Sequence, residues 1–120
     1  MGKIKMDKSK NFNLKQGLDK FIRHCKIKDL SENTINYYFN CYDYFVIFLD
    51  EELGYDEDIK LSKIDKTMIE DFNLWLKNKY NINNTTINTR IRGIRAFLYY
   101  LMRQNILVDF NINLLKTDKK

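Results

Sequence analysis

The chain has 120 residues, of which 44% are hydrophobic and 14% are aromatic, so it is long enough for one domain with a single core. It contains no proline and only four glycines, which disfavours a sheet with many tight turns, and it has no apolar run near the ~18 residues that span a bilayer. The net charge is +5, but acids and bases are segregated along the chain. This segregation favours a polyanionic partner over a uniformly solvated surface.

Three segments are expected along the chain. Residues 1–11 are Lys-rich and lack periodicity, so we expect a flexible basic N-terminus. Residues 12–116 carry helical periodicity and should form one helical domain, and residues 117–120 would begin a linker. The expected fold is all-α, a compact four-helix bundle-like domain with a short C-terminal turn or helix.

The first half of the domain is predicted to contain two helices. Apolar residues at helical spacing predict a first helix over residues 13–26. Ser31 suits an N-cap, and the second helix should reach about Leu53 and stop at Gly54. Residues 55–65 would then form a charged connection.

The second half of the domain should contain two more helices. A third helix is predicted over residues 66–79, with Trp75 on its inward face, and it is followed by an Asn-rich turn at residues 80–84. The fourth helix should run from about residue 85 to 104, and Asn105 is a plausible stop. Apolar residues after this stop should pack back on the bundle: Ile106, Leu107, Phe110, Leu114 and Leu115.

One sequence pattern occurs twice at an interval of 52 residues, with opposite charge. The second helix opens on Asn33-Thr34-Ile35-Asn36 and the fourth on Thr85-Thr86-Ile87-Asn88, and their apolar positions match after these openings. Residues 29–58 hold nine carboxylates and no Lys or Arg, whereas residues 84–108 hold four Arg and no acid. The pattern therefore predicts two similarly packed helices, of which only the fourth is cationic.

The polar residues of the fourth helix share a face. On a helical wheel they form a stripe separate from the apolar one. The helix has no acid to pair with its Arg side chains, and Arg suits bidentate contacts with phosphate or guanine. The members of this stripe are Asn88, Arg92, Arg95, Tyr99 and Arg103.

The residues that common enzyme and metal chemistry requires are scarce. His24 is the only histidine, and an exposed or half-buried structural role is expected for it. Cys25 and Cys41 lack metal-ligand spacing and should be buried thiols in a reducing compartment. We therefore expect no catalytic residue, no metal site, no cofactor and no membrane association, and a cytoplasmic location.

Three motifs, in order, carry a family resemblance. The second helix reads Ser31, Thr34 and Ile35 followed by spaced aromatics, the third reads Met68-Ile69-Glu70-Asp71-Phe72, and the fourth reads Thr86-Ile87-Asn88-Thr89-Arg90-Ile91 and onward. Together they resemble the N-terminal core-binding, SAM-like domain of tyrosine recombinases, the phage-integrase family. The resemblance covers about residues 12–116. One departure is Asn111-Ile112, where the family often has Asn-Pro.

The resemblance implies half of a clamp around duplex DNA. The second and fourth helices would cross the major groove, and a C-terminal catalytic domain of the same protein would supply the nucleophilic Tyr, with other protomers joining in a DNA synapse. This chain would then be part of a longer protein, and its own Tyr residues would not be nucleophiles. The DNA contacts expected are Asn33, Thr34, Asn36, Tyr37 and Asn40 on the second helix, and Thr86, Asn88, Thr89, Arg92, Arg95, Tyr99 and Arg103 on the fourth.

Two other functions fit the same residues. A helical protein-interaction module would use the acidic second helix to bind a basic partner and leave the Arg stripe solvated. A stand-alone regulator of a mobile element would bind DNA without any recombinase domain. Salt-dependent duplex binding separates the interaction module from both DNA-binding alternatives.

Overall fold

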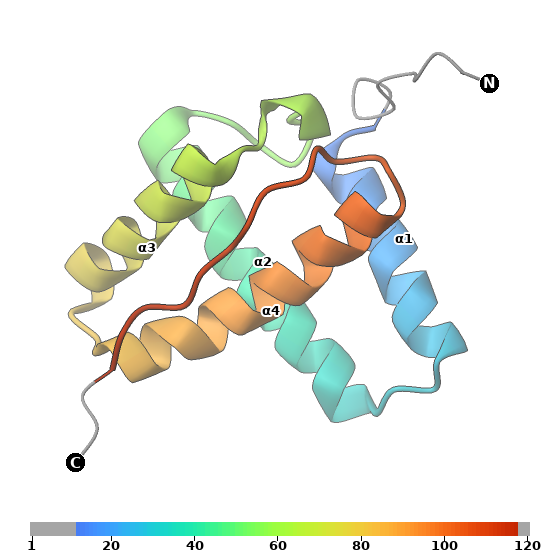
Figure 1. Cartoon of the computed structure of the whole chain (residues 1–120), viewed down its shortest axis with the longest axis horizontal. Coiled ribbons are helices and arrows are strands. Elements are labelled where there is room, and N and C mark those ends of the chain that lie inside the picture. Colours follow the sequence, from blue (N-terminus) through green and yellow to red (C-terminus); the bar gives the residue numbers. More distant parts are fainter. Residues whose placement is uncertain (1–11, 118–120) are drawn as a thin grey trace.

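The computed structural model describes residues 12–117, and in this range the chain folds into four α-helices (Figure 1). The predicted all-α fold is confirmed. The flexible N-terminus predicted for residues 1–11 and most of the linker predicted for residues 117–120 lie outside the described residues. The helices are α1 (Leu14–Ile27), α2 (Glu32–Phe48), α3 (Lys66–Tyr80) and α4 (Asn84–Arg103).

Each helix begins at a residue whose side chain accepts a hydrogen bond from the first turn, which satisfies a backbone N–H that has no partner within the helix. At α1 the cap is reciprocal, because the Gln16 side chain also accepts from the Asn13 backbone. The ends of α3 and α4 are also set by nearby residues, since Asn81 and Asn105, which follow them, adopt positive φ angles of 51° and 63°. The four N-caps are Asn13, Ser31, Asp65 and Asn83.

The α2 helix ends as predicted, but its last turn is wider. After Phe48 the chain continues as a π-helical turn, η2 (Leu49–Leu53), before Gly54 takes up a left-handed conformation with φ of 72°. Glycine suits this stop because it has no Cβ to clash at positive φ.

Helices α2 and α4 form the centre of the fold. They make the largest interhelix contact and cross each other, with α1 and α3 packed on opposite sides (Figure 1). The aromatic rings of Phe45, Phe48 and Phe72 pack against one another between α2 and α3. Trp75 joins this cluster and is buried, as predicted.

The apolar positions of the two repeated helices are not fully equivalent. Ile91 is completely buried in α4, whereas the matching Phe39 in α2 is exposed. Ile35 and Val46 are only half-buried. The prediction of two similarly packed helices therefore overstates how much of α2 is covered.

The connection between η2 and α3 is packed rather than only charged. Ile59, Leu61 and Ile64 are buried, with Leu61 opening a short 3-10 turn, η3 (Leu61–Lys63). Backbone hydrogen bonds, arranged as in a single bridge between two strands, join this connection to the start of α1. One of them runs from the Leu14 N–H to Ile59 O, at 2.9 Å. The connection closes the core beneath α1.

Residues 106–117, here named the C-terminal strap, run back along α4 in an extended conformation (Figure 1). Of the apolar residues expected to pack on the bundle, Ile106 and Leu107 are buried, and the other three, Phe110, Leu114 and Leu115, are partly buried against the core, so the expected packing is confirmed. Ile112, which was not among them, is buried as well. The chain turns at the end of α4, but no helix follows that turn among the described residues. The final helix considered for this segment is therefore absent there.

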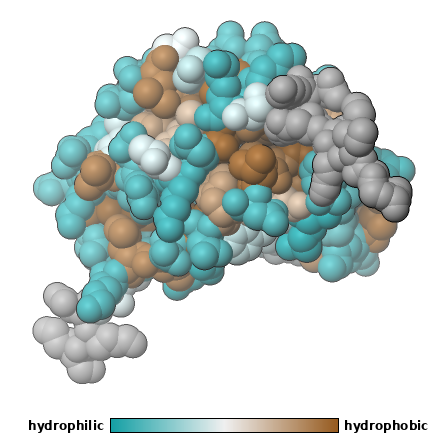
Figure 2. Space-filling model, turned by 45° about the horizontal axis from the view of Figure 1, so that its top comes forward, coloured by the Kyte–Doolittle hydropathy of each residue, from teal (hydrophilic) through white to brown (hydrophobic). Residues whose placement is uncertain are grey.

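Hydrophobic side chains also reach the surface. Figure 2 shows them in separate patches among hydrophilic residues. Within residues 12–117, no helix combines the length and the apolarity that crossing a bilayer requires. In the described part of the chain, the large exposed hydrophobic residues are Ile27, Phe39, Ile47, Leu53, Leu74 and Val108.

Candidate nucleic-acid interface

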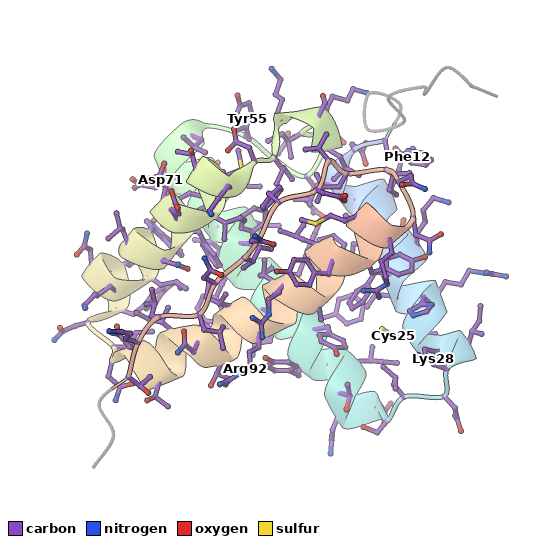
Figure 3. All side chains as sticks on the ribbon, in the orientation of Figure 1. Phe12, Cys25, Lys28, Tyr55, Asp71 and Arg92 are labelled. Carbon is purple, nitrogen blue, oxygen red and sulfur yellow. The ribbon has the colours of Figure 1, made fainter. Side chains whose placement is uncertain are left out.

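A groove of about 380 Å³ lies between the second half of α1, the start of α2 and the exposed face of α4. Three arginines, one lysine and His24 line it, and none of the described residues that line it is acidic. We name it the cationic groove. Figure 3 labels three of the residues that line it, and the two cations among them, Arg92 and Lys28, lie along the same edge of the molecule. Its cations are Lys28, Arg92, Arg95 and Arg103.

Aromatic rings support the walls of the cationic groove. Phe21 of α1 meets the ring of Tyr38 of α2 edge-on, with 5.0 Å between the ring centroids, and both line the groove. His24 is half-buried, as expected, and its ring lies 4.7 Å from that of Tyr100. Packed rings hold the backbone of three helices in fixed relative positions, so the cations are presented on a rigid surface.

Arg92 and Arg103 are the free cations of α4. Both are exposed, and neither of the two ion pairs among the described residues involves an arginine. The helix itself offers them no carboxylate, as the sequence indicated. Two guanidinium groups without an internal partner are available to an external anion.

The rest of the predicted stripe faces the C-terminal strap. Asn88 is only 3% exposed, so the expectation of an exposed side chain was wrong. Its amide donates to Leu115 O at 2.9 Å and accepts from the Leu115 N–H at 2.8 Å. Tyr99 accepts from the Ile112 N–H at 2.9 Å, and Arg95 is half-buried with its guanidinium 3.4 Å from Ile112 O.

These bonds explain the burial physically. An extended strap has no internal partners for its backbone groups, and a buried unpaired group is costly. Asn88 and Tyr99 supply the missing partners. Arg95 still lines the cationic groove, so it can serve both surfaces, whereas Asn88 cannot reach a ligand on the outside.

The fourth arginine of α4 is internal. The Arg90 guanidinium lies 4.1 Å from the centroid of the Tyr44 ring and donates to the Tyr44 hydroxyl at 2.8 Å. Both residues are half-buried. Arg90 therefore joins α4 to α2 and adds no free charge to the groove.

The predicted DNA contacts on α2 also divide into exposed residues and residues that form bonds within the fold. Asn33, Asn36 and Asn40 are exposed along its first turns. Thr34 is half-buried and serves the cap, because its N–H donates to the Ser31 hydroxyl at 3.1 Å.

Tyr37 is half-buried and joins α2 to α4, since its hydroxyl donates to the backbone carbonyl of Thr89. Burial raises the pKa of Tyr37 to about 12. On α4 itself, the Thr86 N–H donates to the Asn83 cap at 2.9 Å, and the Thr89 side chain is exposed. Besides Arg92 and Arg103, the exposed members of the predicted set are thus Asn and Thr side chains.

Sequence reasoning missed the contribution of α1. Lys28 and His24 line the cationic groove, as does Tyr38 of α2. The strongly basic N-terminal third of the sequence was a signal, but the helical pattern of α1 does not say on which side of α4 its end will lie. No cluster of three His, Cys, Asp or Glu residues that could hold a metal ion occurs within residues 12–117.

Comparison with protein families gives one match. A family model described as the phage integrase SAM-like domain matches residues 18–113, a range that includes most of α1, the other three helices and most of the strap. Neither the curated proteins nor the solved structures contain a significant match to the chain.

Proposed function

The chain belongs to the phage integrase SAM-like domain family, and from that premise we propose that it is the non-catalytic module by which a tyrosine recombinase holds duplex DNA. The observation that carries the proposal is the cationic groove, which gathers Lys28 from the end of α1 and Arg92, Arg95 and Arg103 from α4, with no acid among the described residues that line it. Phosphate contacts of this kind supply most of the affinity for duplex DNA and position a protein on it.

The start of α2 would add neutral contacts. Asn33, Asn36 and Asn40 are exposed near the helix N-terminus, where the helix dipole favours an anion. Amide side chains can bind base edges or backbone oxygens. In this arrangement the arginines bind phosphates and the amides of α2 make the shorter-range contacts beside them.

The acidic end of the molecule would point away from DNA. Asp71 and Arg92 lie on opposite edges of the molecule in Figure 3. Carboxylates of η2 and α3 would repel phosphate, whereas the cationic groove attracts it. The segregated charge therefore orients the module as it approaches a duplex.

Strand cleavage would belong to another domain of the full-length protein. The tyrosines of α2 are poorly suited to nucleophilic attack, because the Tyr42 hydroxyl donates to Glu57 at 2.7 Å and burial beside that carboxylate raises its pKa. Burial also raises the pKa of Tyr37 to about 12. A nucleophile needs the opposite shift, toward an ionised hydroxyl.

Titration of a fluorescently labelled duplex at two salt concentrations tests the DNA-binding proposal. One half of a clamp contacts few phosphates, so we expect a dissociation constant of about 10⁻⁴ to 10⁻⁶ M near physiological salt, weakening as salt rises. Absence of binding at low salt, or binding that salt does not change, would favour the protein-interaction module instead.

A further inference from the structure

Two residues of the cationic groove are also bound by the C-terminal strap. Arg95 and Tyr99 both line the groove, and both form a hydrogen bond with the peptide group of Ile112. The Ile112 N–H donates to the Tyr99 hydroxyl at 2.9 Å, and the Arg95 guanidinium donates to the Ile112 carbonyl at 3.4 Å. Figure 1 shows the strap running back along α4. The strap therefore contacts the site proposed for phosphate from behind.

These bonds leave both groove side chains able to bind an anion. A guanidinium has five N–H donors, and Ile112 accepts from only one nitrogen of Arg95. The Tyr99 oxygen already accepts from the Ile112 N–H, so its own O–H is free to donate elsewhere. Among the described residues its acceptor is the Ile112 carbonyl, at 3.4 Å, and a charged phosphate oxygen is a stronger acceptor than a carbonyl at that distance.

A side chain that is held in place binds an anion more tightly than a mobile one. A freely moving arginine loses rotamer entropy when it binds, but part of that loss has already occurred during folding if a second bond holds the side chain. Of the three groove arginines, only Arg95 forms a hydrogen bond with a described residue. Arg95 is therefore the cation that the strap orients before a ligand arrives.

Beyond Ile112 the strap is held to α4 by Asn88. The Asn88 amide donates to Leu115 O at 2.9 Å and accepts from the Leu115 N–H at 2.8 Å. Both bonds are short, and Asn88 is buried, so water competes poorly for them. The neighbouring bond from Asn84 to Lys116 O is exposed to water. Loss of the Asn88 amide should therefore loosen the strap and, with it, the Ile112 peptide.

We propose that Asn88 is a positioning residue for DNA binding. It touches no DNA itself, but its two bonds to Leu115 keep the Ile112 peptide where it orients Arg95 and Tyr99 toward a phosphate. The inference rests on the proposed function of the cationic groove and adds the strap to that site. Coupling of this kind is reciprocal, so DNA in the groove stabilises the strap by the same factor by which the ordered strap strengthens DNA binding.

A double-mutant cycle tests this role, with titration of a labelled duplex at low salt as the measurement. Asn88→Ala should weaken binding about fivefold, although position 88 is buried and uncharged. In an Arg95→Ala background the same change should weaken binding by less than about twofold, because only Tyr99 then remains to be oriented. In an Arg92→Ala background the full loss should remain, since no bond joins Arg92 to a described residue of the strap.

Tyr42→Phe is the control for a general loss of stability. It removes a hydrogen bond of a buried side chain, to Glu57, outside both the strap and the cationic groove, and should leave duplex affinity unchanged. Equal affinity of Asn88→Ala and the wild type would overturn the positioning role and leave the proposed function standing. So would an equal loss in the Arg95→Ala and Arg92→Ala backgrounds. A wild-type chain that binds no duplex would overturn both.

Hydrogen exchange of the wild-type chain gives a measurement that needs no substitution. A saturating duplex at low salt should slow exchange of the Leu115 amide about fivefold, the factor that reciprocity requires. The Asn81 amide, which donates to Lys77 O at the end of α3, lies outside the strap and the groove and should not change. Exchange at Leu115 that bound duplex leaves unaltered would overturn the proposal even where Asn88→Ala fails to fold.

Discussion

Gly93 of α4 lies directly against Cys41 of α2, and these residues are equivalent positions of the pattern that recurs after 52 residues. A Cβ at position 93 would lie only 2.8 Å from Cβ of Cys41. One turn before each of them, Tyr37 donates to the carbonyl of Thr89, which is again the equivalent residue, 52 positions along the chain. The repeated pattern therefore places the crossing of the two central helices at the same point of each.

Gly93→Ala should destabilise the protein although alanine favours helices. Cys41 is buried in the core and its Cβ, close to the backbone, cannot move aside, so overpacking should cost about 1–3 kcal/mol. Urea denaturation measures the loss. Gly17→Ala is the control, because its nearest neighbour is the flexible end of Leu101 at 3.1 Å, and we expect a smaller effect. Equal stability of Gly93→Ala and the wild type would contradict this crossing.

Trp75→Ala should cost about 3–5 kcal/mol of unfolding free energy, because it removes a buried indole. The Trp75 ring lies against Phe48 and Phe72, with centroids 5.7 and 6.0 Å away. Leu74→Ala, on the exposed side of the same helix, should change the free energy by less than about 0.5 kcal/mol. Denaturant curves for the two variants should differ accordingly, and a loss below about 1 kcal/mol for Trp75→Ala would place the ring outside the core.

Asn88→Ala should loosen the C-terminal strap. The change leaves the N–H and the carbonyl of Leu115 without their partner, which should cost about 1–3 kcal/mol. Hydrogen exchange of the Leu115 amide should accelerate. Asn113→Ala, at an exposed position of the same strap, serves as the control. Unchanged exchange at Leu115 in Asn88→Ala would show that these bonds do not hold the strap.

Arg92→Ala combined with Arg103→Ala should weaken duplex binding. If each arginine contacts one phosphate, the slope of log affinity against log salt should fall in magnitude by up to about 2. Melting temperature should stay nearly constant, because both residues are exposed. Lys63→Ala with Lys66→Ala removes the same charge outside the groove and should leave the slope unchanged. Equal slopes for the two double variants would exclude the cationic groove as the DNA site.

Arg90→Ala should have the opposite effects on stability and DNA binding to the Arg92→Ala and Arg103→Ala double variant. It removes the hydrogen bond and the ring contact with Tyr44, so unfolding free energy should fall while the salt slope stays that of the wild type. Denaturation and duplex titration of the same sample measure both. A reduced salt slope with unchanged stability would mean that Arg90 faces the DNA.

Stability should decline in alkaline solution. Burial raises the pKa of the Cys25 and Cys41 thiols above 9.0, and that of Tyr37 from 10.0 to about 12. A group whose pKa is higher in the folded state than in the unfolded state contributes its full share of stability at pH values below its unfolded-state pKa. This share is lost as the pH rises through its folded-state pKa. Unfolding free energy should therefore fall between about pH 9 and pH 12. Tyr37→Phe should make the fall shallower, and an identical pH profile would contradict the role of Tyr37.

The helices could be predicted because their signals are local. Ser31 marks the start of α2 because its side chain caps the helix. Gly54 marks the end of the π turn that follows α2 because its backbone can adopt a positive φ. Neither signal depends on distant residues. The burial of Trp75 followed from the apolar periodicity of α3 alone. Such features are set within one or two turns of helix.

The division of the polar stripe could not be predicted in the same way. A helical wheel separates polar from apolar positions, but it does not distinguish a side chain in water from one that binds the backbone of another segment. Asn88 and Arg92 look alike on the wheel, yet the strap buries the first and leaves the second free. The place of Lys28 in the cationic groove was hidden for a related reason, because it depends on how α1 packs against α4.

The direction of the C-terminal strap has a mechanical consequence. Its hydrogen-bond partners on α4 run in reverse order, from Tyr99 at the middle of the strap to Asn88 and Asn84 near its end. Tension applied at Thr117 would load these contacts one after another, beginning with Asn84, rather than all together. The strap should therefore peel from α4 under a small force while the four helices remain folded, so that a pull on the following chain is absorbed before it reaches the core.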